Sequence, residues 1–303
     1  MSRDDAIRVA SPTERVNPDT RDIDLLPTQE ILRLFNVEDR TVPEAVGRVL
    51  PELAEAVDLA VAALRAGGKV HYVGAGTSGR LAVLDAAELV PTFNAPPDWF
   101  VAHQAGGQDA YQQAVENAED DGESGAREIR EAATSKDFVV GLAASGRTPY
   151  VISALRAARE LGAGTALVTS NPDPGEVPAD VVIPVDTGPE PISGSTRMKA
   201  GTAQKLVLTS FSTAVMIRLG RVYSNFMVSM LATNAKLRGR TINILQEATG
   251  APEAACAEAL TAAGGDLKTA LVHLLSGADV ERSAAALTLA DGHVREALQN
   301  LRG

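Results

Sequence analysis

The sequence lacks cysteine pairs, long apolar runs and dense basic tracts. Its single cysteine, Cys256, excludes an internal disulfide, and no apolar run approaches the roughly 20 residues of a membrane span. Residues 1–10 carry charges without an apolar core, so we expect no secretory signal and predict a cytoplasmic protein. The histidines are scattered without ligand spacing, so we expect no metal site. They are His71, His103, His273 and His293.

The chain has 28 Lys and Arg residues against 39 Asp and Glu residues, a formal net charge of −11. An acidic surface without a basic tract repels phosphodiester backbones and anionic headgroups. We therefore expect neither a nucleic acid nor a membrane surface as partner. A length of 303 residues suits one large α/β domain with a smaller one.

Apolar runs rich in β-branched residues alternate with helical patterns through the first two thirds of the chain. The runs cover residues 69–74, 99–103, 137–144, 165–170 and 181–186. The helical patterns between them cover residues 81–88, 110–118, 125–133 and 149–161. Near-continuous apolar strands are typical of a parallel sheet that is buried on both faces. We predict an α/β fold with a doubly wound five-stranded parallel sheet, which binds ligands at the carboxyl ends of its strands.

Changes in composition and hydrophobic pattern along the sequence predict that the chain has three parts. Residues 1–42 form an N-terminal arm and a short helix at 29–36, and the polar segment 1–27 either packs on another part or stays disordered. Residues 43–235 form the α/β domain, which includes one long helix from Thr41–Pro43 to Leu64 and another from Thr196 to Leu219. Residues 236–303 form a helical subdomain that resembles a ubiquitin-associated unit, and we interpret it as a packing module. Its expected helices cover residues 241–249, 252–263, 266–275, 279–287 and 292–301.

Gly74, Gly76 and Gly79 match the Gly-x-Gly-x-x-Gly pattern of dinucleotide binding. That mechanism also needs a carboxylate at the end of the second strand, and residues 101–104 supply none. We therefore favour a different anion at this strand-to-helix turn, bound by backbone N–H groups and by Thr77 and Ser78, with the cation Arg80 beside them.

A second hydroxyl-rich turn follows the third strand, with Ser145, Gly146 and Thr148 before Pro149. Two such turns at neighbouring strand ends can converge on one phosphate, although each alone is also explained by helix capping. A third hydroxyl cluster precedes the long helix near residue 199. This cluster has two interpretations. Either Ser195 or Lys199 contacts the sugar or its phosphate, or the cluster only caps the start of the helix.

Two carboxylates are candidates for acid and base chemistry. Glu88 closes the expected helix 81–88 beside apolar Leu89 and Val90, and both a helix end and partial burial would raise its pKa. An exposed glutamate at a helix end is the alternative. Glu119 lies in an acidic cluster that, from local sequence, is more typical of a solvated face.

These motifs together resemble the N-acetylmuramic acid 6-phosphate etherase family, which has the sugar isomerase (SIS) fold. The matching segments are residues 74–85 with Glu88, 143–150, 194–205 and 232–234, with weaker matches at 13–17 and 22–24. The resemblance implies cleavage of the D-lactyl ether of N-acetylmuramic acid 6-phosphate to N-acetylglucosamine 6-phosphate and D-lactate, in recycling of cell-wall sugars. It implies a homodimer and no cofactor. It assigns Glu88 as the acid that protonates the ether oxygen and later activates water, and Glu119 as the base at carbon 2.

One departure from the family pattern follows the first carboxylate. The family commonly has Cys-Pro-Pro-Thr there, whereas this chain has Leu89-Val90-Pro91-Thr92. Two alternatives share the phosphate site: a non-catalytic regulatory protein that binds sugar phosphates, and an aldose–ketose isomerase of sugar phosphates. Both carboxylates and the full motif at 195–205 favour the etherase.

Overall fold

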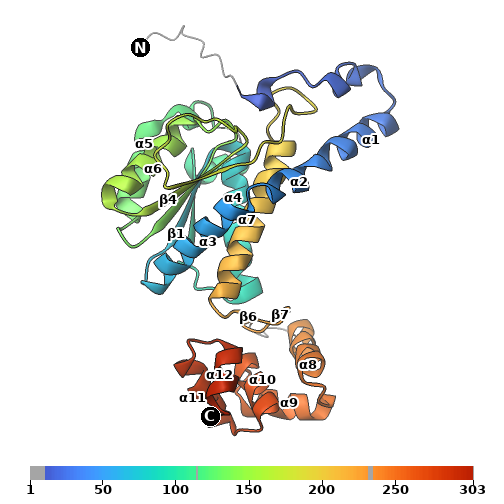
Figure 1. The fold of residues 1–303 in the computed structure, drawn as a ribbon, viewed down its shortest axis with the longest axis vertical. Coiled ribbons are helices and arrows are strands. Elements are labelled where there is room, and N and C mark those ends of the chain that lie inside the picture. The colour runs from blue at the N-terminus through green and yellow to red at the C-terminus, as the bar shows by residue number, and fades with distance from the viewer. Residues whose placement is uncertain (1–10, 114, 231–234, 303) are drawn as a thin grey trace. The chain divides into compact units, whose positions relative to one another are not determined.

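The computed structural model describes residues 11–113, 115–230 and 235–302, and these form two compact units (Figure 1). The first unit contains the residues up to Ala86 together with Asp98–Phe211. The second contains Ala87–Pro97 and the residues from Ser212 onward. Helices α4 (Gly76–Phe93) and α7 (Lys199–Arg218) each contribute residues to both units.

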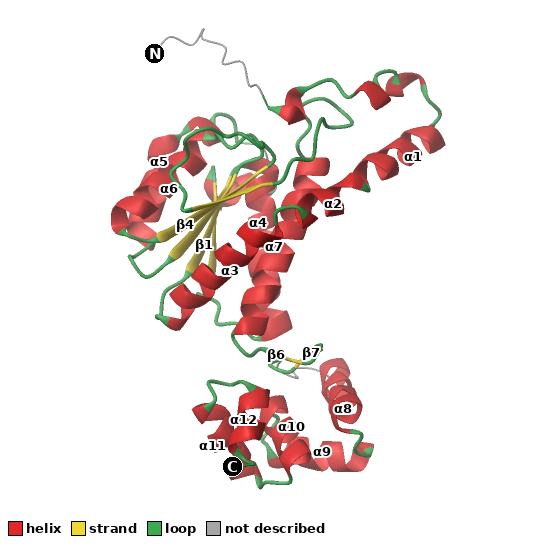
Figure 2. Cartoon of the chain, viewed as in Figure 1, coloured by secondary structure: helices red, strands yellow, loops and turns green. Residues whose placement is uncertain are grey.

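The first unit is built on the predicted five-stranded parallel sheet (Figure 2). Its strands are β1 (Val70–Gly74), β2 (Phe100–Gln104), β3 (Phe138–Leu142), β4 (Gly164–Thr169) and β5 (Val181–Pro184). They lie in the order β2-β1-β3-β4-β5, and every pairing is parallel. The strand order reverses between β1 and β3, and a doubly wound sheet binds ligands at the carboxyl ends of such a pair.

Helices cover both faces of the sheet, which explains the near-continuous apolar strands (Figure 1). On one face, α5 (Gly122–Ala132) and α6 (Pro149–Leu161) pack over Val73, Val139 and Leu167. On the other face, Tyr72 and Phe138 contact Phe211 of α7. Their ring centroids lie 6.2 and 6.3 Å, respectively, from the ring centroid of Phe211. Consecutive residues such as Tyr72 and Val73 therefore enter two different cores.

The described part of the N-terminal arm contacts residues 191–194 through Thr13 and Thr20. It forms short 3-10 turns, and the Thr20 hydroxyl donates to the Pro191 carbonyl at 2.7 Å. Gly194 N–H donates to the Thr13 carbonyl at 2.9 Å. These contacts favour packing for the segment from Thr13 to Thr20.

Two expected helices differ from the structure. The helix expected from 41 to 64 is two helices, α2 (Thr41–Gly47) and α3 (Leu50–Arg65), after α1 (Thr28–Asp39). Pro51 causes the break, because it lacks an N–H and its ring clashes with the preceding turn. The helix expected at 110–118 was wrong. The described residues there form 3-10 turns at Gly107–Tyr111 and Ala118–Asp120, and Asn117 has a left-handed φ of 60°.

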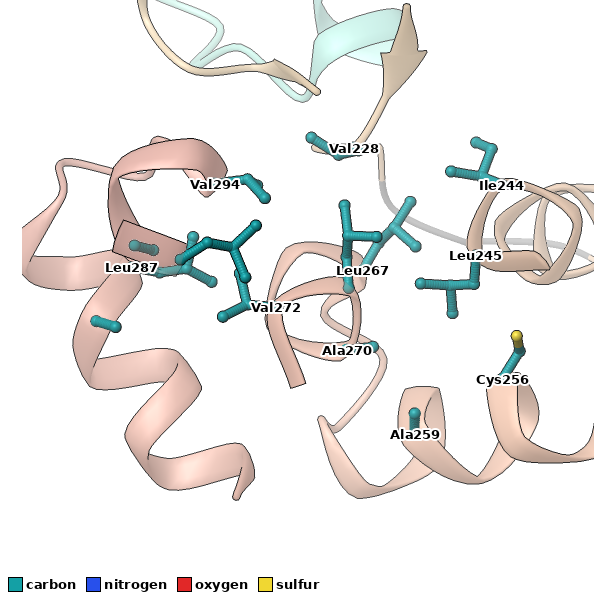
Figure 3. Close-up of a cluster of buried hydrophobic side chains, with 14 of the residues drawn as sticks. Val228, Ile244, Leu245, Cys256, Ala259, Leu267, Ala270, Val272, Leu287 and Val294 are labelled. Atoms are coloured by element: carbon teal, nitrogen blue, oxygen red, sulfur yellow. The ribbon is translucent and has the colours of Figure 1, made fainter. Parts of the chain in front are cut away.

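The second unit has a helical core of its own. It contains α8 (Ala235–Thr249), α9 (Glu253–Ala262), α10 (Leu267–Ser276), α11 (Val280–Leu289) and α12 (Val294–Asn300). Figure 3 shows Leu245, Cys256, Leu267 and Val272 in this core. A hairpin of β6 (Val222–Tyr223) and β7 (Phe226–Met227) was not expected. Among the described residues, no helix is long and apolar enough to cross a membrane.

Candidate active site

The turn after β1 brings a strand end and a helix start into close contact. Gly76 has a φ of +56°, which favours glycine, and a Cβ on Gly79 would overlap the Gln104 side chain. Helix α4 begins at Gly76, so Thr77 and Ser78 lie in its first turn, where backbone N–H groups lack helical partners. Both side chains are half-buried, and neither makes a side-chain hydrogen bond within the described part of the chain.

The turn after β3 starts beside the first one, because Gly74 and Leu142 are register partners. Gly146 has a φ of +73°, and the Ser145 hydroxyl accepts a bond from Arg147 N–H at 3.2 Å. Thr148 is the N-cap residue of α6, but its side chain makes no capping bond. The structure therefore brings both predicted hydroxyl turns to one edge of the sheet, at the strand-order reversal.

The third hydroxyl cluster lies beside the first turn. A Cβ at Gly201, in the first turns of α7, would lie 3.5 Å from Thr77 Cγ2. Ser195 precedes α7 in a turn closed by Met198 N–H donating to its carbonyl at 3.1 Å. The Ser195 side chain is half-buried. The segments that carry the second and third hydroxyl clusters thus both approach the β1 turn and the start of α4.

Lys199 has a different environment from its neighbours. Its side chain is 3% exposed, and its ammonium forms an ion pair with Glu38 of α1 at 2.6 Å. The Glu190 carboxylate accepts bonds from the Lys199 and Ala200 N–H groups at 2.8 and 2.9 Å. Burial raises the pKa of Glu190, against the opposing effect of these two bonds. These carboxylates give Lys199 a role in holding the start of α7.

A cleft of about 250 Å³ in the first unit contains one of the two candidate carboxylates. Glu119 lies on its wall, on the 3-10 turn Ala118–Asp120, and Gly76 and Arg80 line the same cleft. Ala118 packs into the same apolar cluster as Ala75 and Ala143 from the two hydroxyl turns. The fold therefore brings Glu119 close to the β1 turn from 40 residues further along the chain, which local sequence did not indicate.

Comparison with known proteins identifies the family. An N-acetylmuramic acid 6-phosphate etherase from Thermobifida fusca is 61% identical over 269 residues, which is 88% of each chain. Another from Pectobacterium atrosepticum is 50% identical over 288 residues, or 94% of this chain and 95% of that protein. The chain belongs to the N-acetylmuramic acid 6-phosphate etherase family.

Two further similarities concern the SIS architecture of this etherase family. Residues 52–159 match the family described as "Glucokinase regulatory protein N-terminal SIS domain". The structure of a phosphoheptose isomerase from Francisella tularensis aligns with a TM-score of 0.50 at 20% identity, and covers 62% of this chain and 97% of that one. The isomerase likeness supports the fold.

The surroundings expected for Glu88 are absent. Helix α4 continues past it to Phe93, so Glu88 is not at a helix end, and its side chain is exposed. Of its two apolar neighbours, Leu89 is buried and Val90 is 40% exposed. Glu88 is not among the described residues that line the cleft. The etherase-family segment 232–234 lies outside the described residues.

Two polar features of the first unit were missed. Gln104, at the end of β2, lines the cleft and is 3% exposed, and its Oε1 has no hydrogen-bond partner among the described residues. The second feature is a row of polar side chains that contains two histidines. His71 Nδ1 lies 3.0 Å from His103 Nε2, and the Glu128 carboxylate accepts a hydrogen bond from the Tyr150 hydroxyl at 2.7 Å. A polar residue at a strand's carboxyl end was the available signal for Gln104. No sequence signal pointed to the row of polar side chains, since its members are far apart in sequence.

Proposed function

We propose that this protein is an N-acetylmuramic acid 6-phosphate etherase that releases D-lactate and N-acetylglucosamine 6-phosphate. The observation that carries the proposal is identity of 50–61% to etherases over at least 88% of the chain. The two hydroxyl turns at the strand-order reversal support a sugar monophosphate as ligand.

The reaction is an elimination followed by water addition. Glu119 removes the proton from carbon 2 of the open-chain sugar, next to its aldehyde, and the lactyl oxygen leaves carbon 3. Glu88 protonates that oxygen and then takes a proton from the water that adds to carbon 3, while Glu119 returns a proton to carbon 2. The position of Glu119 in the cleft supports its role, whereas the assignment of Glu88 rests on the family resemblance.

Six residues form the phosphate cradle in this proposal: Thr77, Ser78, Ser145, Gly146, Thr148 and Ser195. The first turns of α4 and α6 add backbone N–H groups and the positive ends of two helix dipoles. Lys199 supports this cradle through the start of α7, because its ammonium is paired with Glu38.

The test is release of D-lactate from N-acetylmuramic acid 6-phosphate by the purified full-length protein. We expect turnover by wild type and by Glu123→Gln, an exposed carboxylate outside the cleft, and loss of at least about 100-fold in Glu119→Gln and Glu88→Gln. Absence of lactate from wild type would refute the etherase. Exchange of the carbon 2 proton with deuterated water separates the roles, since Glu88→Gln should retain it and Glu119→Gln should lose it.

The match of residues 52–159 to a regulatory protein's SIS domain favours one alternative, a sugar-phosphate-binding regulator. Binding of N-acetylmuramic acid 6-phosphate without lactate release would support that alternative. We further propose that the etherase works in the cytoplasm as a homodimer. Its single cysteine suits a reducing compartment, and the family resemblance supports the dimer.

A further inference from the structure

Arg80 is the one cationic side chain among the described residues that line the Glu119 cleft. Its Nε donates to the Tyr111 carbonyl at 3.2 Å and its Nη2 donates to the Gln113 carbonyl at 3.3 Å. These bonds cross from α4 to the segment after β2. They fix the plane of the guanidinium against the cleft wall.

The two carbonyls use only one edge of the guanidinium. Arginine carries five N–H donors, and its Nε and Nη2 face the same side. The other edge, formed by Nη1 and Nη2, keeps two parallel N–H donors with the spacing that binds both oxygens of a carboxylate. No carboxylate occupies this edge in the described part of the chain, although Glu116 and Glu119 line the same cleft.

The proposed substrate carries a carboxylate that its sugar product lacks. In N-acetylmuramic acid 6-phosphate, the lactyl group is attached to carbon 3, and Glu119 acts on the adjacent carbon 2. A sugar held with carbon 2 at Glu119 therefore directs its lactyl group into the same cleft. Resting on the proposed function, we infer that Arg80 binds the lactyl carboxylate and makes the site selective for the lactyl ether.

Charge and shape in the cleft agree with this role. Glu116 and Glu119 repel an incoming carboxylate, and the fixed guanidinium of Arg80 offsets that repulsion. Gln104 and Asn117 also line the cleft, and the other lining residues include small apolar side chains that leave room for the lactyl methyl group. They are Ala75, Ala105, Ala110, Val115 and Ala118.

Calorimetry with a chemically altered ligand tests this role independently of turnover. The ligands are N-acetylmuramic acid 6-phosphate and its derivative with the lactyl carboxyl converted to a methylamide, measured with the non-cleaving Glu119→Gln protein. Loss of a charge-assisted bidentate pair should weaken binding of the methylamide by about 10- to 100-fold. In Glu119→Gln/Arg80→Gln, the two ligands should bind within about twofold of each other.

This comparison also separates carboxylate binding from other roles of Arg80. N-acetylglucosamine 6-phosphate has the phosphate but no carboxylate, so Arg80→Gln should leave its affinity unchanged. An equal loss for all three ligands would mean that Arg80 binds phosphate or only supports the loop, and would overturn the inference. Arg130→Gln, on the surface of α5, is the matched control for loss of one positive charge. Lactate release by wild type, measured separately, tests the etherase itself.

Discussion

At the residue scale, His71 makes the free energy of unfolding depend on pH. Its side chain is 1% exposed, and burial together with the neighbouring His103 lowers its pKa from 6.5 to about 4, against the opposing charge of Asp137. The unfolded chain therefore binds a proton at pH 5 that the folded chain does not. Stability from this group is complete above pH 6.5 and is lost as the pH falls toward 4.

We expect the contribution of His71 to fall by about 2 kcal/mol between pH 7 and pH 5. Urea unfolding of wild type and His71→Asn at both values measures it, and the variant should show the smaller loss. His293→Asn, in the second unit, should keep the wild-type pH dependence. Equal pH dependence in wild type and His71→Asn would contradict the assignment.

Gln104 shows what sequence reasoning can and cannot reach at this scale. The sequence identified the end of β2 as a site where a carboxylate was missing, but not that the residue there would be buried against Gly79. Glu38 and Glu190 were missed for the same reason, since both meet Lys199 only through the tertiary fold. Hydroxyls and glycines next to strand ends were predictable because local turn chemistry determines their positions.

At the element scale, Glu190 fixes where α7 begins. Its buried carboxylate accepts two backbone bonds from the first turn, which has no helical acceptors for those N–H groups. We expect Glu190→Ala to lower the free energy of unfolding by about 1–3 kcal/mol, and Glu190→Gln to cost less, since its amide keeps one acceptor. Urea unfolding measures both changes.

The same variants test the link from α7 to the hydroxyl cluster. Displacing the start of α7 moves Ser195, so Glu190→Ala should also raise the KM for N-acetylmuramic acid 6-phosphate. Glu131→Ala, an exposed acid on α5, should change neither quantity. If Glu190→Ala is destabilised but its KM is unchanged, Ser195 does not contact the substrate.

The elements that sequence predicted best are those with a clear apolar pattern, either a near-continuous apolar run or a single helical period. All five strands and α6 lie within a few residues of their predicted bounds. The break at Pro51 was missed because the apolar period of the helix continues across it. The helix expected at 110–118 was wrong because left-handed Asn117 interrupts a sequence that otherwise favours helix.

At the scale of the whole molecule, the N-terminal arm and α1 each carry a large apolar side chain that is exposed. Leu25, on the arm, is 78% exposed and Leu32, on α1, is 61% exposed. Contiguous exposed apolar surface marks protein interfaces, and the proposed homodimer would bury these two leucines against a second copy. Light scattering should therefore give twice the chain mass of 31.6 kDa.

Substitution of the same side chains tests where the copies meet. The double variant Leu25→Asp/Leu32→Asp should shift the measured mass toward that of one chain. Burial of unpaired carboxylates opposes association. Leu289→Asp is the matched control, since Leu289 is also exposed, at 82%, but lies in the second unit, outside the proposed interface. A wild-type mass of one chain would refute the homodimer. A double variant that stays dimeric would place the interface on another surface.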